Sequence, residues 1–172
     1  MNPLLSDSAL PKYDEIKPEH VAEAVDKMAE AVEAGLAAIE SDSRPPSWAA
    51  VIEELNTLED WFTKIWSPVS HLNVVRNEPA LRDAYQAAQP KIVSLGLKIA
   101  QSPALYAKLV SIRDGAEWQK LDEGQKRSIP DRQPEPDAHA RTALGHRFTQ
   151  HVARPTKRMD EPRLAGGLEL LT

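Results

Sequence analysis

Several common features are missing from this 172-residue chain. It contains no cysteine, so it can form neither a disulfide nor a thiolate metal site. A chain without disulfides suits a reducing compartment, and we expect a cytoplasmic protein. The N-terminus has no basic stretch followed by an apolar one, so no secretory signal is expected. Apolar runs never approach 18 residues, and no membrane partner is expected either.

Glycine is scarce, and basic residues are outnumbered by acidic ones. The chain has only 7 glycines and is rich in alanine, a composition that favours helices. Its 21 lysines and arginines against 26 aspartates and glutamates give a net charge of −5, which argues against a nucleic-acid-binding protein. Strand-like alternation is absent up to about residue 129. The predicted fold class of that part is all-α.

The first predicted helix covers residues 18–41, after an extended N-terminal arm at 1–17 that carries two prolines. Pro18 suits the first turn of this helix. Apolar residues recur every three or four positions, as expected when one face of a helix is buried. This stripe consists of Val21, Val25, Met28, Val32, Leu36 and Ile39.

A second helix is predicted over 47–67, with Ser47 as its N-cap. Its large apolar side chains share one face, and such a stripe is far more often core than ligand site. The face comprises Trp48, Val51, Ile52, Leu55, Leu58, Phe62, Ile65 and Trp66, widened by Trp61. Pro68 is expected to end this helix. Ser70 would then cap a short turn through Val75, with Leu72 and Val75 directed to the core.

Three further helices are predicted before residue 129. The third begins near Asn77 or Pro79, and Pro90 should kink or split it. Ser102 can cap the fourth helix, and Asp122 the fifth. Because the connections are short, we expect neighbouring helices over 18–129 to pack in an antiparallel arrangement.

The composition changes at about residue 130. Residues 130–172 hold six arginines but one lysine, together with three of the five histidines, and apolar periodicity disappears. Such a segment buries little apolar area and is predicted to be irregular and poorly ordered. A natural disordered tail, a small binding arm and translation in a shifted reading frame are the three interpretations.

The motifs of common catalytic sites are also absent. No H-E-x-x-H, which would hold zinc and activate its bound water, occurs in the chain. His20 is followed by valine and His71 by leucine, while His146 and His151 are five residues apart, a poor spacing for one metal. Phosphate-binding glycine loops and nucleophile motifs are missing as well. We therefore predict no catalytic residue, metal ligand or cofactor in this chain.

The stretch "SPVSHLN" at 67–73 carries a family resemblance. Followed by Arg76-Asn77, Pro79, Leu81-Arg82 and Ala84-Tyr85, it resembles the N-terminal region of the oligopeptidase A group in the thimet oligopeptidase family of zinc metallopeptidases. Further similar segments are "NPLL" at 2–5, "LPKYDEIKPEHV" at 10–21, "LYAKLVSIRDG" at 105–115 and "LDEGQKRSI" at 121–129. The resemblance runs over about 1–129 and stops there, which favours the shifted reading frame for 130–172.

This resemblance implies an antiparallel helical N-terminal domain of a neurolysin-like metallopeptidase. Full-length members use zinc to hydrolyse short oligopeptides, and the helical domain lines one side of a deep channel. Their zinc-binding region lies beyond the part represented here, so we expect no activity from these 172 residues. The signature residues, whose role is unassigned, are Ser67, Pro68, Ser70, His71, Asn73 and Asn77.

An alternative function is a stand-alone helical module that binds a peptide or a partner protein. The apolar face of the 47–67 helix would pack against later helices in a complete enzyme. In this chain it could remain partly exposed and allow self-association. For His71 and Asn73, local hydrogen bonding is favoured over ligand contact.

Overall fold

The computed structural model describes residues 1–8, 10–76 and 78–129. Over these residues the chain is helical and has no strand, which confirms the predicted all-α class. The elements are η1 (Pro3–Leu5), α1 (Glu19–Ser41), η2 (Trp48–Glu53), α2 (Glu54–Val75), α3 (Pro79–Ala100), α4 (Pro103–Arg113), η3 (Ala116–Lys120) and α5 (Glu123–Arg127). The predicted irregular tail at 130–172 lies outside the described residues.

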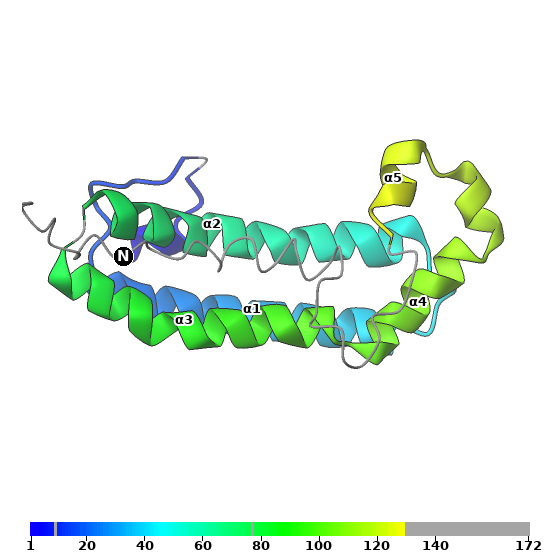
Figure 1. The fold of residues 1–172 in the computed structure, drawn as a ribbon, viewed down its shortest axis with the longest axis horizontal. Helices are drawn as coiled ribbons and strands as arrows, with labels where there is room; N and C mark the ends of the chain where they lie inside the picture. Colours follow the sequence, from blue (N-terminus) through cyan, green and yellow to red (C-terminus); the bar gives the residue numbers. More distant parts are fainter. Residues whose placement is uncertain (9, 77, 130–172) are drawn as a thin grey trace, which may run out of the picture.

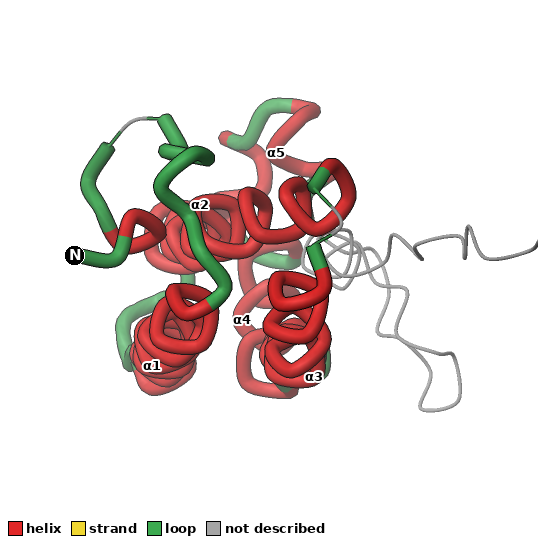
Figure 2. The backbone as a smooth tube through the Cα atoms, turned by 90° about the vertical axis from the view of Figure 1, so that its left-hand side faces the viewer, coloured by secondary structure: helices red, strands yellow, loops and turns green. Residues whose placement is uncertain are grey.

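Three long helices form the body of the domain. Figures 1 and 2 show α1, α2 and α3 side by side, with α2 running opposite to the other two. Helix α4 continues beyond the end of α3, and η3 and α5 then turn back toward the start of α2. The antiparallel arrangement of sequence neighbours is therefore confirmed for these three helices.

The core lies between α1, α2 and α3. All six residues of the predicted α1 stripe are buried. From η2 and α2 come Val51, Ile52, Leu55, Leu58, Phe62, Ile65 and Trp66, which are all buried, whereas Trp48 and Trp61 are only partly buried. Most of the apolar face of the second predicted helix is thus covered within the domain, and Trp48 and Trp61 stay partly exposed. Self-association through this face stays a prediction.

Local side-chain caps start several of the helices, as the sequence predicts. The hydroxyl of Ser47 accepts a hydrogen bond from the Ala50 N–H at 3.1 Å, and Ser102 caps α4 through the Leu105 N–H at 3.0 Å. Asp122 and Gln125 form a reciprocal capping box at the start of α5. These caps satisfy N–H groups that have no partner inside their helices.

Pro68 does not end the second helix, contrary to the prediction. Helix α2 continues through it to Val75, so the expected turn capped by Ser70 does not exist. A proline removes one backbone hydrogen bond from a helix. Here Pro68, Val69 and Leu72 are all buried, and this burial offsets the lost bond. Because the helix continues, Val75 lies on its outer side and is exposed, which also corrects its assignment to the core.

Pro90 likewise leaves α3 unbroken over Pro79–Ala100, so the predicted split is wrong. The proline is exposed, and its ring lies on the solvent side of the helix. On that side it displaces no core contact, and the buried residues Leu81 and Ile92 lie to either side of it in the sequence. Packing of the inner face therefore holds the helix together across Pro90.

The N-terminal segment 1–17 is anchored more firmly than an extended arm would be. Residues Pro3–Leu5 form a turn of 3₁₀ helix, and Leu4 and Ile16 are buried in the core. The side-chain amide of Asn2 donates to the carbonyl oxygen of His20 at 2.8 Å and to the Glu23 carboxylate at 3.1 Å. These bonds fix the segment against the start of α1.

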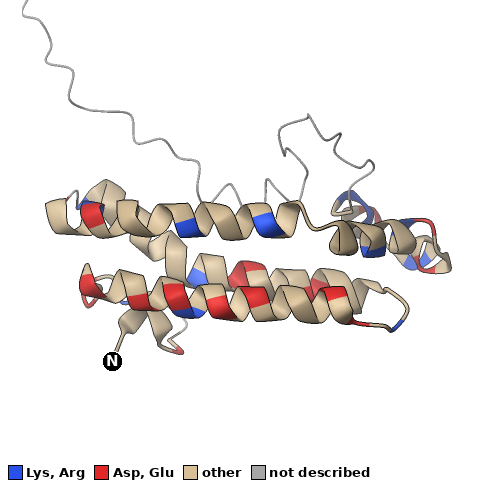
Figure 3. Cartoon of the chain, turned by 90° about the horizontal axis from the view of Figure 1, so that it is seen from below, with Lys and Arg blue, Asp and Glu red and all other residues tan. Residues whose placement is uncertain are grey.

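Two ion pairs join the exposed sides of α1 and α3. Lys91 Nζ lies 2.7 Å from Asp26 Oδ1, and Lys98 Nζ lies 2.9 Å from Glu33 Oε1. Figure 3 shows the acidic row along α1 facing the basic residues of α3. The hydrogen bond and charge of Lys98 lower the pKa of Glu33 below its ordinary value of 4.5.

The two interior prolines give a first prediction. Pro90→Ala should raise the free energy of unfolding by up to about 3 kcal/mol, because it restores a helix hydrogen bond and removes no buried group. Pro68→Ala should gain less, since its ring is buried and a cavity would replace it. Urea unfolding followed by circular dichroism measures both values. An equal gain for the two variants would contradict the role assigned to Pro68.

Acid unfolding tests the pair between Glu33 and Lys98. Since its pKa is lowered in the folded chain, Glu33 contributes fully above pH 4.5. That contribution is lost as the pH falls below this value toward the folded-state pKa. Glu33→Gln should therefore weaken the pH dependence of stability below pH 4.5. The control is Glu30→Gln on the same helix, and an equal effect from both variants would be evidence against the pair.

Candidate functional site

The family-signature residues do not form a loop; those within the described residues share helix α2. Pro68 and Asn73 are buried, Ser67 and Ser70 are partly buried, and His71 is exposed. Asn77, the sixth signature residue, lies outside the described residues. Sequence reasoning placed this stretch between two helices, whereas the structure makes it the last two turns of one helix.

Two side-chain oxygens of this stretch are buried without a hydrogen bond. They are Ser70 Oγ and Asn73 Oδ1, which no described group contacts as a donor. The residues are three apart, so both side chains lie on adjacent positions of one helix face. Buried polar groups usually have partners, and each exception calls for an explanation. The local hydrogen bonding expected for Asn73 is therefore not made by this oxygen.

His71 is engaged with the N-terminal segment. Its ring centroid lies 5.3 Å from that of Tyr13, with a tilt of 60° between the planes. The neighbouring Arg76 Nη2 donates to the Tyr13 carbonyl oxygen at 3.3 Å. His71 thus contacts an aromatic ring, which is a packing role for its side chain.

No group of three or more metal-ligating side chains occurs within the described residues. His20, the other described histidine, accepts a hydrogen bond at Nδ1 from the Lys17 N–H at 3.1 Å. The described residues therefore do not supply a ligand set for the zinc that the family resemblance implies. Across the same residues, no helix is long and apolar enough to cross a membrane.

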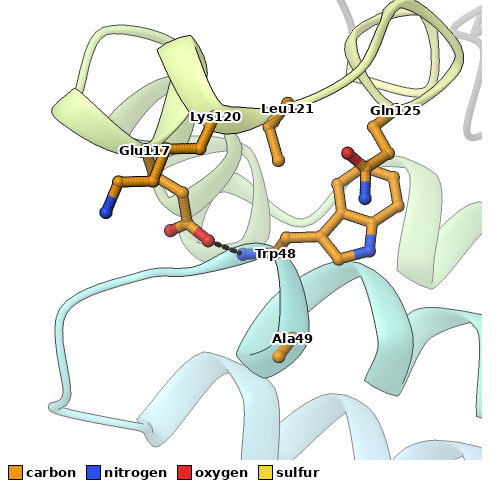
Figure 4. Close-up of a pocket in the computed structure, with 6 residues that line it drawn as sticks. All are labelled: Trp48, Ala49, Glu117, Lys120, Leu121 and Gln125. Carbon is orange, nitrogen blue, oxygen red and sulfur yellow. Dashed lines mark hydrogen bonds between the residues drawn. The ribbon is translucent and has the colours of Figure 1, made fainter.

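A cleft of about 540 Å³ lies where the start of α2 meets the last helical turns (Figure 4). Its lining comes from η2 on one side and from η3 and α5 on the other. The lining residues are Trp48, Ala49, Glu117, Lys120, Leu121 and Gln125. A partly buried indole, a lysine and an amide thus face one another across a cleft that is open to solvent.

Glu117 ties the two sides of this cleft together. Its Oε1 accepts a hydrogen bond from the backbone N–H of Trp48 at 3.0 Å, drawn as a dashed line in Figure 4. Trp48 is the first residue of η2, where free N–H groups and the helix dipole favour a negative charge. Sequence reasoning missed this residue because Glu117 lies 69 positions away and no local pattern marks it.

The Glu117 contact yields a stability prediction. Glu117→Ala should lower the free energy of unfolding by about 1–2 kcal/mol, because it removes a charge-assisted hydrogen bond from a helix start. Lys120→Ala in the same cleft should have little effect, and it serves as the control. Urea titration with tryptophan fluorescence measures both. Equal stability of the two variants would show that the bridge to Trp48 contributes nothing.

Comparison with known proteins assigns the domain. The family description "Neurolysin/Thimet oligopeptidase, N-terminal domain" matches residues 25–135, which extends beyond the expected end of similarity at Ile129. Oligopeptidase A of Salmonella typhimurium is 35% identical over 128 residues, and that of Escherichia coli is 34% identical over 128 residues. The organellar oligopeptidase A of Arabidopsis thaliana is 32% identical over the same length.

These matches cover very different shares of the proteins involved. They include 74% of this chain but 19% of each bacterial relative and 16% of the plant one. The chain therefore spans about a fifth of the length of the bacterial relatives. The helical fold and the family match agree over the long helices of the body. The chain belongs to the neurolysin/thimet oligopeptidase family, as a representative of its N-terminal domain.

Proposed function

We propose that this chain is the N-terminal part of an oligopeptidase A-like zinc metalloendopeptidase that hydrolyses short oligopeptides. The family match over 25–135 is the observation that carries the proposal. The names of the bacterial relatives, oligopeptidase A, support peptides as the substrate class. In this role the three-helix body would form part of the wall around a peptide channel, with no nucleic acid or membrane as partner.

These 172 residues alone are proposed to be inactive. The zinc-binding H-E-x-x-H sequence occurs nowhere in them. Without a metal-bound water and a general base, peptide hydrolysis has no activated nucleophile. Zinc is therefore proposed for the full-length enzyme and for none of the residues described here. The cytoplasmic location stays a prediction, and so does the shifted reading frame for 130–172.

A stand-alone binding module is the second candidate, favoured by the cleft at Trp48. Its volume of about 540 Å³ is enough for a few peptide residues. Such a module would be monomeric in light scattering and would melt cooperatively. Aggregation that increases with concentration would instead favour a domain separated from its natural neighbours.

A peptidase assay tests the proposed inactivity. The full 172-residue chain, supplied with zinc and an internally quenched fluorescent oligopeptide, should give no turnover above the blank. The Salmonella typhimurium oligopeptidase A serves as the positive control under the same conditions. Turnover that a chelator abolishes in the chain itself would overturn the proposal.

A further inference from the structure

The cleft at Trp48 contains polar groups that the domain itself does not use. The Lys120 ammonium and the Trp48 indole N–H have no partner among the described residues. Glu117 accepts the Trp48 backbone N–H at Oε1, which leaves its Oε2 for another donor. Gln125 accepts the Asp122 N–H at Oε1, which leaves its amide nitrogen for another acceptor. The cleft therefore offers three donors and one carboxylate oxygen to a ligand.

Most of this lining is held in place by the domain. The hydrogen bond to the Trp48 N–H, 3.0 Å long, fixes the Glu117 carboxylate. The capping box with Asp122 fixes the Gln125 side chain and identifies its oxygen, since only the oxygen can accept an N–H. Leu121 is buried in the core at 7% exposure. A ligand that binds here orders few side chains, so little conformational entropy opposes binding.

The charged groups of the cleft lie together. Glu117 and Lys120 are three residues apart in η3, a 3₁₀ helix, in which side chains at this spacing are aligned. They form no ion pair with each other or with any other described residue. Figure 4 places them on one side of Leu121, and Gln125 with the Trp48 indole on the other. The cleft thus has a charged side and an aromatic side.

The two charges select the kind of ligand. A ligand with a single charge is attracted by one of Glu117 and Lys120 and repelled by the other. A ligand that carries an ammonium and a carboxylate close together satisfies both. The head group of an α-amino acid has this arrangement, because both charged groups are attached to one carbon atom. The charged side of the cleft is therefore complementary to a zwitterion.

We propose that this cleft binds a free α-amino acid with an aromatic side chain. Its carboxylate accepts hydrogen bonds from Lys120, and its ammonium donates to Glu117 Oε2. Its ring passes Leu121 and packs on the Trp48 indole, where the Gln125 amide nitrogen donates to the ring face. The inference goes beyond the proposed peptidase function, because it assigns a ligand to the cleft and no reaction.

The size of the cleft agrees with this ligand. Its volume of about 540 Å³ is within the range of small-molecule sites. One aromatic amino acid fills the part beside the indole and leaves the open side to solvent. A short peptide is the competing ligand. Its charged ends are separated by at least one peptide unit, whereas Glu117 and Lys120 are aligned neighbours, so the spacing favours the single amino acid.

Calorimetry with the full 172-residue chain tests the ligand class. The probe is L-phenylalanine, compared with 3-phenylpropionate, which lacks the ammonium, and phenethylamine, which lacks the carboxylate. N-acetyl-L-phenylalanine amide lacks both charges. Phenylalanine should bind at least about tenfold more tightly than each analogue, because each analogue loses a hydrogen bond between charged groups. No binding of phenylalanine, or equal binding of any analogue, overturns the inference. Tighter binding of the dipeptide L-Phe-L-Phe assigns the cleft to peptides and also overturns it.

Substitutions test the charged side of the cleft. Lys120→Ala and Glu117→Gln should each weaken phenylalanine binding at least about tenfold. Glutamine keeps an acceptor for the Trp48 N–H, so this variant should stay folded. The matched controls Lys27→Ala and Glu30→Gln make the same changes on the exposed side of α1 and should bind normally. Binding that neither cleft variant weakens shows that the charges do not hold the ligand.

Nuclear magnetic resonance locates the bound ligand. Addition of phenylalanine should shift the indole N–H signal of Trp48, which Trp48→Phe identifies, and leave those of Trp61 and Trp66 in place. A shift at Trp61 or Trp66 without one at Trp48 places the ligand elsewhere and overturns the inference. None of these results bears on the proposed function, which fails instead if the chain alone shows chelator-sensitive peptide hydrolysis.

Discussion

Burial of the inner face of α2 is the interaction on which the other elements depend. Phe62, Ile65 and Trp66 are completely buried between α1 and α3, and the Trp66 ring stacks on Tyr85 with centroids 4.6 Å apart. Large aromatic side chains contribute more buried area than any other residues, so this contact dominates the core. The N-terminal segment then packs against the second half of α2, and Glu117 of η3 bonds to Trp48 at the start of η2.

The two ion pairs between α1 and α3 affect the alignment of these helices more than their stability. Asp26 and Glu33 are seven residues apart on α1, and their partners Lys91 and Lys98 are seven apart on α3. Two pairs with equal spacing can form together only when these helices run parallel in one alignment. Exposed ion pairs add little stability. The apolar stripes therefore hold the helices together, while the two lysines favour one alignment over a shifted one.

The sequence predicted what is local and missed what tertiary contacts decide. Ser47, Ser102 and Asp122 were found as caps because a cap acts on N–H groups two or three residues away. Pro68 was misjudged because its cost is local, whereas the burial that offsets it comes from neighbouring elements. Glu117 was missed for a similar reason, because its partner Trp48 is far away in the sequence. The unpartnered oxygens of Ser70 and Asn73 were missed because their burial also depends on neighbouring elements. Only packing reveals which polar atoms lose water and which gain a partner.

The difference between the two ends of α2 connects the fold with the family assignment. An independent domain gains nothing from exposed valines beside buried oxygens that lack donors, since both lower its stability or solubility. Here one end carries a carboxylate that bonds to a helix start beside a cleft, and the other end combines exposed valines with buried oxygens that have no hydrogen bond.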